Sequence, residues 1–428
     1  MTRRLVAAGA ALFIGVLAVA LLFIRSSPES YDAQTMYQVT QSLVDRGNFE
    51  VHRDPFDMNI PYSFYGIGMS LLMAPPYWLA EKFSQDPALW VMAVNAIVAA
   101  ATAVAIFILA LTMRATTSQA IATSALTVFG TLILPYVATG FSEPTVGLAI
   151  ALGLIAVQTT RPGLAGAASS LAILMRPESA LLVMPILAIA SWARRPGKKT
   201  VLLFTAGLLP SIVITAAYNA LRYGAPWRTG YFFASFNHPL LAGLYGLLFS
   251  PGAGLFVYVP MAAVCAVGYW LAVRTAPVLV VTALALFIAR VAFFAVWFGW
   301  QAYWAWGPRY LMPLMPIFAV GLLEILRRWS FMSLAWKPLI VASLSVSVAV
   351  QVVGAAVGYE HAAMFQALLK AHPERPGRAF VYDEANPTTE ALWDRIEFDW
   401  SLWPIPDEAQ DLLKGQDLAG ALFRGGRK

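Results

Sequence analysis

Long apolar runs dominate the chain and are separated by short polar or proline- and glycine-containing segments. An apolar helix of about 20 residues is long enough to cross the hydrocarbon core of a bilayer. By that criterion we predict membrane-spanning helices over residues 5–24, 88–113, 118–139, 142–160, 199–222, 254–273, 276–299, 309–326 and 338–358. The pattern therefore predicts an all-α polytopic membrane protein.

A further apolar stretch over 163–193 is interrupted by Met175-Arg176-Pro177-Glu178. Because each half is short, we interpret the stretch as a hairpin of two helices with the charged residues at its apex. These two arms bring the predicted total to about 11 transmembrane helices.

Two loops between these helices are long enough to carry structure of their own. The first, about 25–87, contains a helical pattern at 31–46 and a short, proline-interrupted apolar stretch at 66–81. The second stretch is typical of a helix that lies in the membrane interface. A second large loop covers about 223–253.

The composition agrees with a membrane protein and excludes a soluble enzyme. Hydrophobic residues make up 59% of the 428 residues and charged residues 12%, with a mean hydropathy of +0.66, whereas soluble domains carry about 25% charged residues. The single cysteine, Cys265, excludes an intramolecular disulfide framework. The net charge of +6 combines +10 from residues 1–358, the predicted transmembrane domain, with −4 from the predicted C-terminal tail, 359–428.

Positive charge predicts the orientation, because loops rich in Lys and Arg stay on the cytoplasmic side. With the N-terminus inside, the inner loops collect most of the basic residues of the transmembrane domain. These are Arg3, Arg4, Arg114, Arg161, Arg194, Arg195, Lys198, Lys199, Arg274, Arg327, Arg328 and Lys337. Glu324 is the one acidic residue of that domain on the same side. We therefore expect both large loops and the tail outside, and the first span to be an uncleaved anchor because no small-residue cleavage site follows it.

Ionisable residues inside a membrane domain are costly and mark candidate functional sites. On the expected topology one set of them lies towards the outer face, and the inner face carries no comparable set. The set consists of Asp32, Glu143, Arg176, Glu178, Arg290 and Arg309. Its common side predicts a single extracytoplasmic site.

Each of these residues also has a purely structural explanation. Asp32 can be a solvated loop charge, and Glu143 follows a serine and precedes a proline, which is a good helix start. Arg176 and Glu178 can neutralise each other, and Arg309 can reach phospholipid headgroups. Several independent loops would then have to place charge on one side by accident, which favours a functional site.

Aromatic residues and glycines accumulate at the same face. Residues 297–310 contain four tryptophans and two tyrosines beside Arg309, and the glycine-rich second loop adds Arg228, Tyr231 and His238. An interfacial aromatic belt explains part of this pattern. Aromatic faces also stack on sugar rings, however, and arginine is the preferred bidentate ligand of phosphate.

Short motifs along residues 1–330 carry a family resemblance by their order and topological side rather than singly. They are Tyr31-Asp32, Arg46-Gly47, Tyr65-Gly66, Ser142-Glu143-Pro144, Arg176-Pro177-Glu178, Thr229-Gly230-Tyr231, Leu248-Phe249-Ser250-Pro251-Gly252, Gly254-Leu255-Phe256 and Trp306-Gly307-Pro308-Arg309-Tyr310. Together they resemble the GT-C superfamily of polytopic glycosyltransferases, in particular bacterial relatives of the polyprenyl- and dolichyl-phosphate-sugar-dependent mannosyl- and arabinosyltransferases.

The resemblance implies transfer of a hexosyl or pentosyl group from a polyprenyl-phosphate donor to a lipid or glycan acceptor, outside the cytoplasmic membrane of a bacterium and with inversion. Asp32 resembles the family's catalytic aspartate and is expected to be the general base, with Glu143 orienting a substrate or serving as the alternative base. The expected ligands of the donor phosphate are Arg309, Arg176, Arg290 and Arg228. The expected sugar or acceptor contacts are Tyr65, Glu178, Tyr231, His238, Trp304, Trp306 and Tyr310.

The sequence assigns no cofactor. The family often has an acidic pair in the first outer loop, but here only Asp32 lies near the span, which leaves a divalent cation, Mg or Mn, open. The histidines, His52, His238, His361 and His372, show no metal-ligand spacing. A nucleotide-binding glycine motif is also missing from the sequence, which fits a lipid-linked donor.

Three other functions stay in competition. A flippase for a lipid-linked sugar would show internal symmetry and midplane charges, whereas the charges here are one-sided. A polymerase or ligase of lipid-linked glycans shares the logic of the site. A non-catalytic scaffold gives the outward arginines no purpose.

Overall fold

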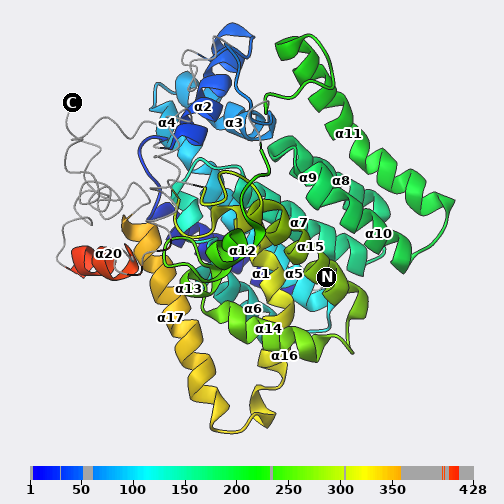
Figure 1. Ribbon diagram of the computed structural model, residues 1–428, viewed down its shortest axis with the longest axis vertical. Coiled ribbons are helices and arrows are strands. Elements are labelled where there is room, and N and C mark those ends of the chain that lie inside the picture. The colour runs from blue at the N-terminus through cyan, green and yellow to red at the C-terminus, as the bar shows by residue number, and fades with distance from the viewer. Residues whose placement is uncertain are drawn as a thin grey trace.

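The computed structural model describes residues 3–28, 30–51, 61–231, 235–302, 305–357, 398, 400 and 404–413. Within these ranges the secondary structure is helical, apart from one isolated β-bridge between Glu50 and Tyr62. Long helices pack side by side over most of the molecule (Figure 1). The all-helical class predicted from the apolar pattern is confirmed for this part of the chain.

Six helical stretches in the described residues are long and apolar enough to cross a membrane. They are α1 (Arg3–Leu21), α4 with α5 (Pro87–Met92 and Val94–Thr112), α11 (Lys198–Tyr223), α15 (Pro277–Ala295), η3 with α16 (Arg309–Ile317 and Phe318–Arg327) and α17 (Trp336–Val357). Shorter apolar helices are α7 (Glu143–Gln158), α8 (Pro162–Met175), α9 with α10 (Ser179–Leu182 and Met184–Arg194), α12 (Leu240–Phe249) and α14 (Met261–Ala272). The chain is therefore a multi-pass membrane protein.

Proline and glycine shorten several of the predicted spans. The span predicted at 118–139 is α6 (Thr117–Phe129), which ends before Gly130, followed by a separate 3-10 turn, η2 (Pro135–Ala138). The span predicted at 254–273 is divided at Pro260 into α13 (Leu255–Tyr258) and α14. Hydropathy alone does not register such breaks, because proline and glycine change backbone geometry more than apolar character.

The first loop carries the helices expected of it. Helix α2 (Tyr31–Gln41) runs into a π-helical turn, η1 (Ser42–Arg46), and α3 (Gly68–Lys82) packs against both. Ser30 caps α2, since its side chain accepts a hydrogen bond from the Ala33 amide at 3.1 Å. This cap fixes the start of α2 and with it the position of Asp32 in the first turn of the helix.

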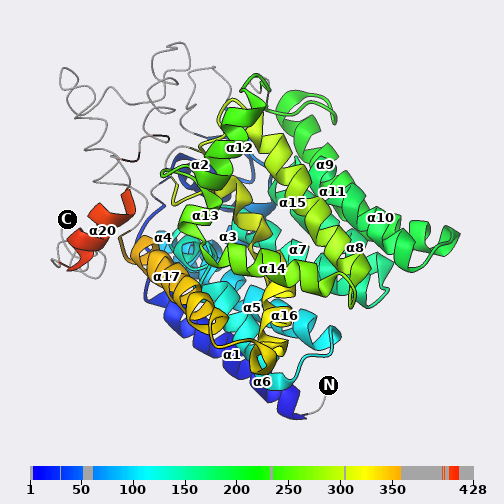
Figure 2. The same cartoon turned by 60° about the horizontal axis from the view of Figure 1, so that its bottom comes forward.

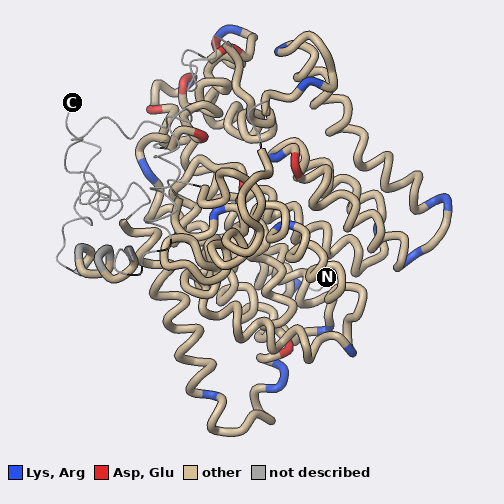
Figure 3. The backbone as a smooth tube through the Cα atoms, in the orientation of Figure 1, with Lys and Arg blue, Asp and Glu red and all other residues tan. Residues whose placement is uncertain are grey.

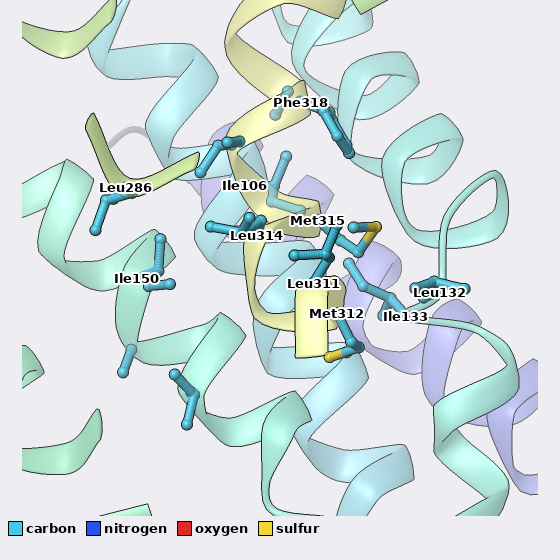
Figure 4. Close-up of a cluster of buried hydrophobic side chains, with 14 of the residues drawn as sticks. Ile106, Leu132, Ile133, Ile150, Leu286, Leu311, Met312, Leu314, Met315 and Phe318 are labelled. Atoms are coloured by element: carbon cyan, nitrogen blue, oxygen red, sulfur yellow. The ribbon is translucent and has the colours of Figure 1, made fainter. Parts of the chain in front are cut away.

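The core is centred on the η3–α16 segment. Pro313 and Pro316 lie inside η3 and lack backbone N–H groups, which favours the 3-10 form over a regular α-helix. Around it Figure 4 shows the packed apolar side chains of Ile106, Leu132, Ile133, Ile150, Leu286, Leu311, Met312, Leu314, Met315 and Phe318. This enclosure holds the start of η3, where the Trp-Gly-Pro-Arg-Tyr motif ends, in a fixed place.

Helices α8 and α11 make an extensive, close contact at one edge of the bundle (Figure 1). A Cβ atom on Gly166 would collide with the backbone of Phe204, and one on Gly207 would collide with the backbone of Gly163 and Ala167. Such small residues let two membrane helices approach to backbone contact. The pair is therefore locked at its crossing point.

The described part of the C-terminal tail lies against the bundle. Helix α20 (Pro404–Leu413) packs beside α17 (Figure 2). Phe398 stacks on Trp300 at a centroid distance of 5.3 Å and on Tyr245 at 5.7 Å. The rest of the tail predicted at 359–428 falls outside the described residues.

Candidate active site

Two carboxylates and two guanidiniums meet at the end of the bundle that carries the first loop. Arg176 Nη2 lies 3.2 Å from Asp32 Oδ2 and 2.6 Å from Glu143 Oε1. Arg309 Nε lies 2.7 Å from Glu143 Oε1, and Arg309 Nη2 donates to Asp32 Oδ2. The four side chains form a closed ring in which the charges alternate and cancel, which we call the charge ring.

The members of the charge ring come from four segments that are distant in sequence. Asp32 lies in the first turn of α2 and Glu143 in the first turn of α7, while Arg176 follows the last residue of α8. Arg309 begins η3. Most charged residues lie near the ends of helices, and a small group lies near the centre of the molecule in this view (Figure 3).

Because the members of the charge ring are buried, each of their charges needs an opposite charge close by. The side chain of Glu143 is completely buried, those of Arg176 and Arg309 are 7% and 6% exposed, and that of Asp32 is 15% exposed. A buried charge is tolerated only with an opposite charge and good hydrogen bonds. Asp32 is the most exposed member and the one that a substrate reaches most readily.

Aromatic rings hold the guanidiniums from the side. The Arg309 Cζ atom lies 3.6 Å from the centroid of Phe141, and the Arg176 Cζ atom lies 5.5 Å from that of Tyr65. Tyr65 also hydrogen-bonds to the Asp32 carboxylate. Cation–π contacts of this kind fix the planes of the guanidiniums as well as adding attraction.

The charge ring sets the protonation state of Asp32. Burial opposes ionisation, but the positive charges of Arg309 and Arg176 outweigh it and hold the pKa of Asp32 below its usual value of 3.8. Burial and the neighbouring Asp32 charge raise the pKa of Tyr65 well above 10, so its phenol is neutral and donates to that carboxylate. Asp32 is therefore an ionised acceptor at neutral pH.

A second ion pair adjoins the charge ring. Arg290 Nη2 lies 4.0 Å from Glu178 Oε1, and Arg290 Nε donates to the carbonyl of Tyr310. Arg290 is 1% exposed, and its two terminal nitrogens have no hydrogen-bond partner among the described residues. Arg176 and Glu178 form no ion pair with each other, since each is paired with another residue.

The other predicted residues lie at varying places around this centre. Tyr231 is half-buried and lies close enough to Arg176 for the guanidinium charge to act on its phenol, and Tyr310 stacks on Phe294 at 4.2 Å. Trp306 is buried against Tyr258. Arg228 is exposed and bonds the Tyr223 carbonyl, His238 bonds the Ala295 carbonyl through Nδ1, and Trp304 falls outside the described residues.

Two residues near the charge ring were not singled out from the sequence. Phe141 lies directly before Ser142-Glu143-Pro144, and its role under Arg309 has no sequence signal beyond that proximity. Arg222 ends the long helix α11 and is buried. An arginine at the end of a membrane helix is normally an interfacial anchor, so only its burial distinguishes it.

A metal-binding cluster is not formed within the described ranges, where no group of three or more His, Cys, Asp or Glu residues comes together. Asp32 and Glu143 instead share the two guanidiniums of the charge ring. A cation at this place would compete with both arginines, so this arrangement does not fit a resident metal ion.

Comparisons of the sequence alone leave the family open. A scan against protein-family models finds no match, and neither does a search of curated proteins.

Solved structures match the fold. ArnT from Cupriavidus metallidurans, in the apo state, superimposes with a TM-score of 0.56 at 15% identity, covering 96% of this chain and 76% of that one. The Archaeoglobus fulgidus oligosaccharyltransferase, in the apo form, gives 0.50 at 13% identity, over 89% and 60%. The oligosaccharyltransferase AglB of that organism, in complex with an inhibitory peptide and a dolichol-phosphate, gives 0.50 at 11% identity, over 86% and 58%.

The present chain thus spans about three fifths of the length of the archaeal enzyme and a larger share of ArnT. At these identities the likeness concerns the fold, and it extends over nearly the whole chain. The protein therefore shares the fold of ArnT and of the archaeal oligosaccharyltransferase.

Proposed function

We propose that the protein transfers a hexosyl or pentosyl group from a polyprenyl-phosphate donor to a lipid or glycan acceptor. The reaction takes place on the outer face of the cytoplasmic membrane of a bacterium, with the N-terminus inside. The observation that carries the proposal is the charge ring, in which an ionised carboxylate and two arginines meet in one buried place.

Asp32 is the general base. Its carboxylate is ionised because Arg309 and Arg176 stabilise the charge, and it is the most exposed member of the charge ring. It accepts the proton of the acceptor hydroxyl while that oxygen forms a bond to the anomeric carbon. Tyr65, which donates to the carboxylate, keeps it oriented.

The arginines stabilise the leaving group. The bond between the anomeric carbon and the phosphate oxygen breaks, and the electron pair remains on the polyprenyl phosphate. Arg309 has N–H groups beyond those it gives to the carboxylates, and Arg176 Nε has no hydrogen-bond partner in the described part of the chain. Fixed cations at the developing charge lower the barrier without reorganising during the reaction. Arg290, whose two terminal nitrogens have no hydrogen-bond partner among the described residues, is a further phosphate ligand.

A single displacement of this kind inverts the anomeric configuration. Glu143 holds both arginines through Oε1, and it is too deeply buried to be the first choice of base. Its role is to orient the guanidiniums towards the donor. The chemistry needs no metal ion, because the arginines supply the positive charge.

The comparisons support the choice of donor. AglB, which shares the fold, has been solved in complex with a dolichol-phosphate. A lipid phosphate is the kind of anion that arginines at a membrane surface bind.

The test is a transfer assay with purified full-length protein in nanodiscs and a panel of polyprenyl-phosphate hexoses and pentoses. Asp32→Asn should lower turnover by about 100-fold or more, the usual contribution of a general base. Asp45→Asn is the matched control, because Asp45 lies in the same loop and bonds Tyr77 rather than the charge ring. Its turnover should stay near that of the unaltered protein.

Undiminished turnover in Asp32→Asn would remove the assignment of the base. Retention of anomeric configuration in the product, read by NMR, would contradict the single displacement. Movement of intact donor between leaflets, with no sugar transferred from any member of the panel, would overturn the transferase proposal in favour of a flippase.

A further inference from the structure

One buried arginine has no ion-pair partner among the described residues. The charged side chains buried in these residues are Glu143, Arg176, Arg222, Arg290, Arg309 and Glu324. All except Arg222 have an ion-pair partner within 4.0 Å. Arg222 is 7% exposed, so its charge lies away from water, and no acidic side chain in the described part of the chain pairs with it.

Neutral groups hold the Arg222 guanidinium. Nη1 donates to the Ser63 carbonyl, Nη2 donates to Asn219 Oδ1 at 2.8 Å, and Nε donates to the Tyr218 carbonyl at 3.3 Å. The Cζ atom lies 3.5 Å from the centroid of the Tyr218 ring. A guanidinium has two hydrogens on each terminal nitrogen, so Nη2 keeps one that no described residue uses.

Arg222 lines a cavity that lies next to the charge ring. Polar side chains in its wall include those of Arg222, Asn219, Thr215 and Thr229. The wall also contains Pro177 and Tyr231, which neighbour Arg176 in sequence and in space respectively. The cavity therefore extends from an unpaired cation to the edge of the charge ring.

The cavity is built by close approaches of backbone. A Cβ on Gly66 would lie 3.0 Å from the Met175 carbonyl oxygen, and a Cβ on Gly230 would lie 2.6 Å from Phe64 Cα. These contacts bring the first loop, the end of α8 and the second large loop together around α11. The wall is thus made from the segments that carry Tyr65 and Arg176.

We propose that this cavity binds a phosphate-type anion of a lipid-linked substrate, with Arg222 as its counter-charge. The inference rests on the proposed function for the identity of the substrate, and it assigns a second anion site besides the charge ring. The charge ring is electrically neutral, whereas Arg222 is the one charged side chain among the described residues that line the cavity, and an anion is bound strongly beside a cation in a surrounding of low dielectric constant. The anion is either the phosphate of the polyprenyl carrier or the headgroup phosphate of an acceptor lipid.

The experiment measures binding without turnover. Purified full-length protein in phosphatidylcholine nanodiscs is titrated with polyprenyl phosphate, with phosphatidylglycerol and with inorganic phosphate, and bound lipid is counted by native mass spectrometry. Arg222→Gln should weaken the binding of one lipid at least about tenfold, and Arg222→Lys should retain most of it. Loss for polyprenyl phosphate assigns the cavity to the carrier, and loss for phosphatidylglycerol assigns it to an acceptor lipid.

A second variant guards against misfolding, because Arg222 also holds the first loop. Thr215→Phe fills the cavity from α11 and leaves Arg222 in place, so it should weaken the same lipid. Ile212→Phe is the control, since Ile212 lies on the same helix, is 50% exposed and does not line the cavity. Its lipid binding should be unchanged.

The outcomes separate this inference from the proposed function. If no phosphate compound, inorganic phosphate included, depends on both Arg222 and Thr215, the inference is wrong even if the protein transfers sugar. If the lipid binds through the cavity and no sugar is transferred from any donor, the inference stands and the transferase proposal fails.

Discussion

Removing one charge from the charge ring should destabilise the protein, and removing a matching opposite charge as well should add little further loss. Glu143 is completely buried, and its Oε1 accepts bonds of 2.6 and 2.7 Å from two guanidiniums. Glu143→Leu leaves two arginines facing Asp32 alone. Breaking a buried ion pair from one side lowers the free energy of unfolding by about 3–5 kcal/mol, and we expect a loss in that range.

The double variant Glu143→Leu/Arg309→Met keeps one carboxylate and one guanidinium, Asp32 and Arg176, 3.2 Å apart. The remaining pair is neutral, so the second substitution should add little. We expect the loss in the double variant to be smaller than the sum of the single losses by about 2 kcal/mol, within the range of couplings measured for neighbouring residues.

The assay is reversible unfolding of the purified protein in mixed micelles, followed by tryptophan fluorescence as the denaturing detergent is increased. Glu143→Leu combined with Arg327→Met serves as the control, because Arg327 pairs with Glu324 and makes no contact with the charge ring. Those two losses should add to within about 0.5 kcal/mol. A loss below about 1 kcal/mol in Glu143→Leu, or full additivity in the Glu143→Leu/Arg309→Met variant, would refute the reasoning.

Three further predictions concern activity. Because the pKa of Asp32 is held below 3.8, the transfer rate should not decrease between about pH 8 and pH 5 and should fall only as the pH passes through the lowered pKa. A decrease centred near pH 6 would contradict the assignment of Asp32 as the base. Phe141→Leu removes the ring 3.6 Å from Arg309. It should weaken donor binding, measured by titration, by about 3- to 10-fold and should affect turnover less. Unchanged affinity would count against a role of Arg309 at the phosphate. Since arginines neutralise both Asp32 and Glu143, the transfer rate after treatment with a chelator should stay within about twofold of the untreated rate. Loss of activity that Mg²⁺ or Mn²⁺ restores would show that the charge ring opens to bind a cation.

The helices could be predicted from the long apolar runs, but the breaks in them could be predicted only in part. The predicted helix at 309–326 begins as a 3-10 segment because Pro313 and Pro316 lie in its first half. Hydropathy hardly distinguishes a 3-10 segment from an α-helix. The helix boundaries at α7 and α11, by contrast, agree with the predicted spans to within two residues, since serine-proline and glycine signals mark their ends.

The residues of the charge ring could be nominated from the sequence, but not their pairing. Asp32, Glu143, Arg176 and Arg309 all stood out as charges expected on one face of a membrane domain. Which carboxylate contacts which guanidinium depends on how α2, α7, α8 and η3 pack, and one sequence does not encode that packing in any local pattern. The burial of Arg222 could not be predicted either, because loop residues far along the chain create it.

The locked crossing of α8 and α11 has a mechanical consequence. From Gly207 to Arg222 the helix rises roughly 22 Å, and from Gly166 to Arg176 the chain rises roughly 15 Å. Both arginines therefore lie on the C-terminal side of the close crossing at Gly166 and Gly207. Their spacing, and so the distance between the cavity and the charge ring, depends on how closely the two helices approach there. A single methyl group added at Gly166 or Gly207 would push the helices apart and should change that distance.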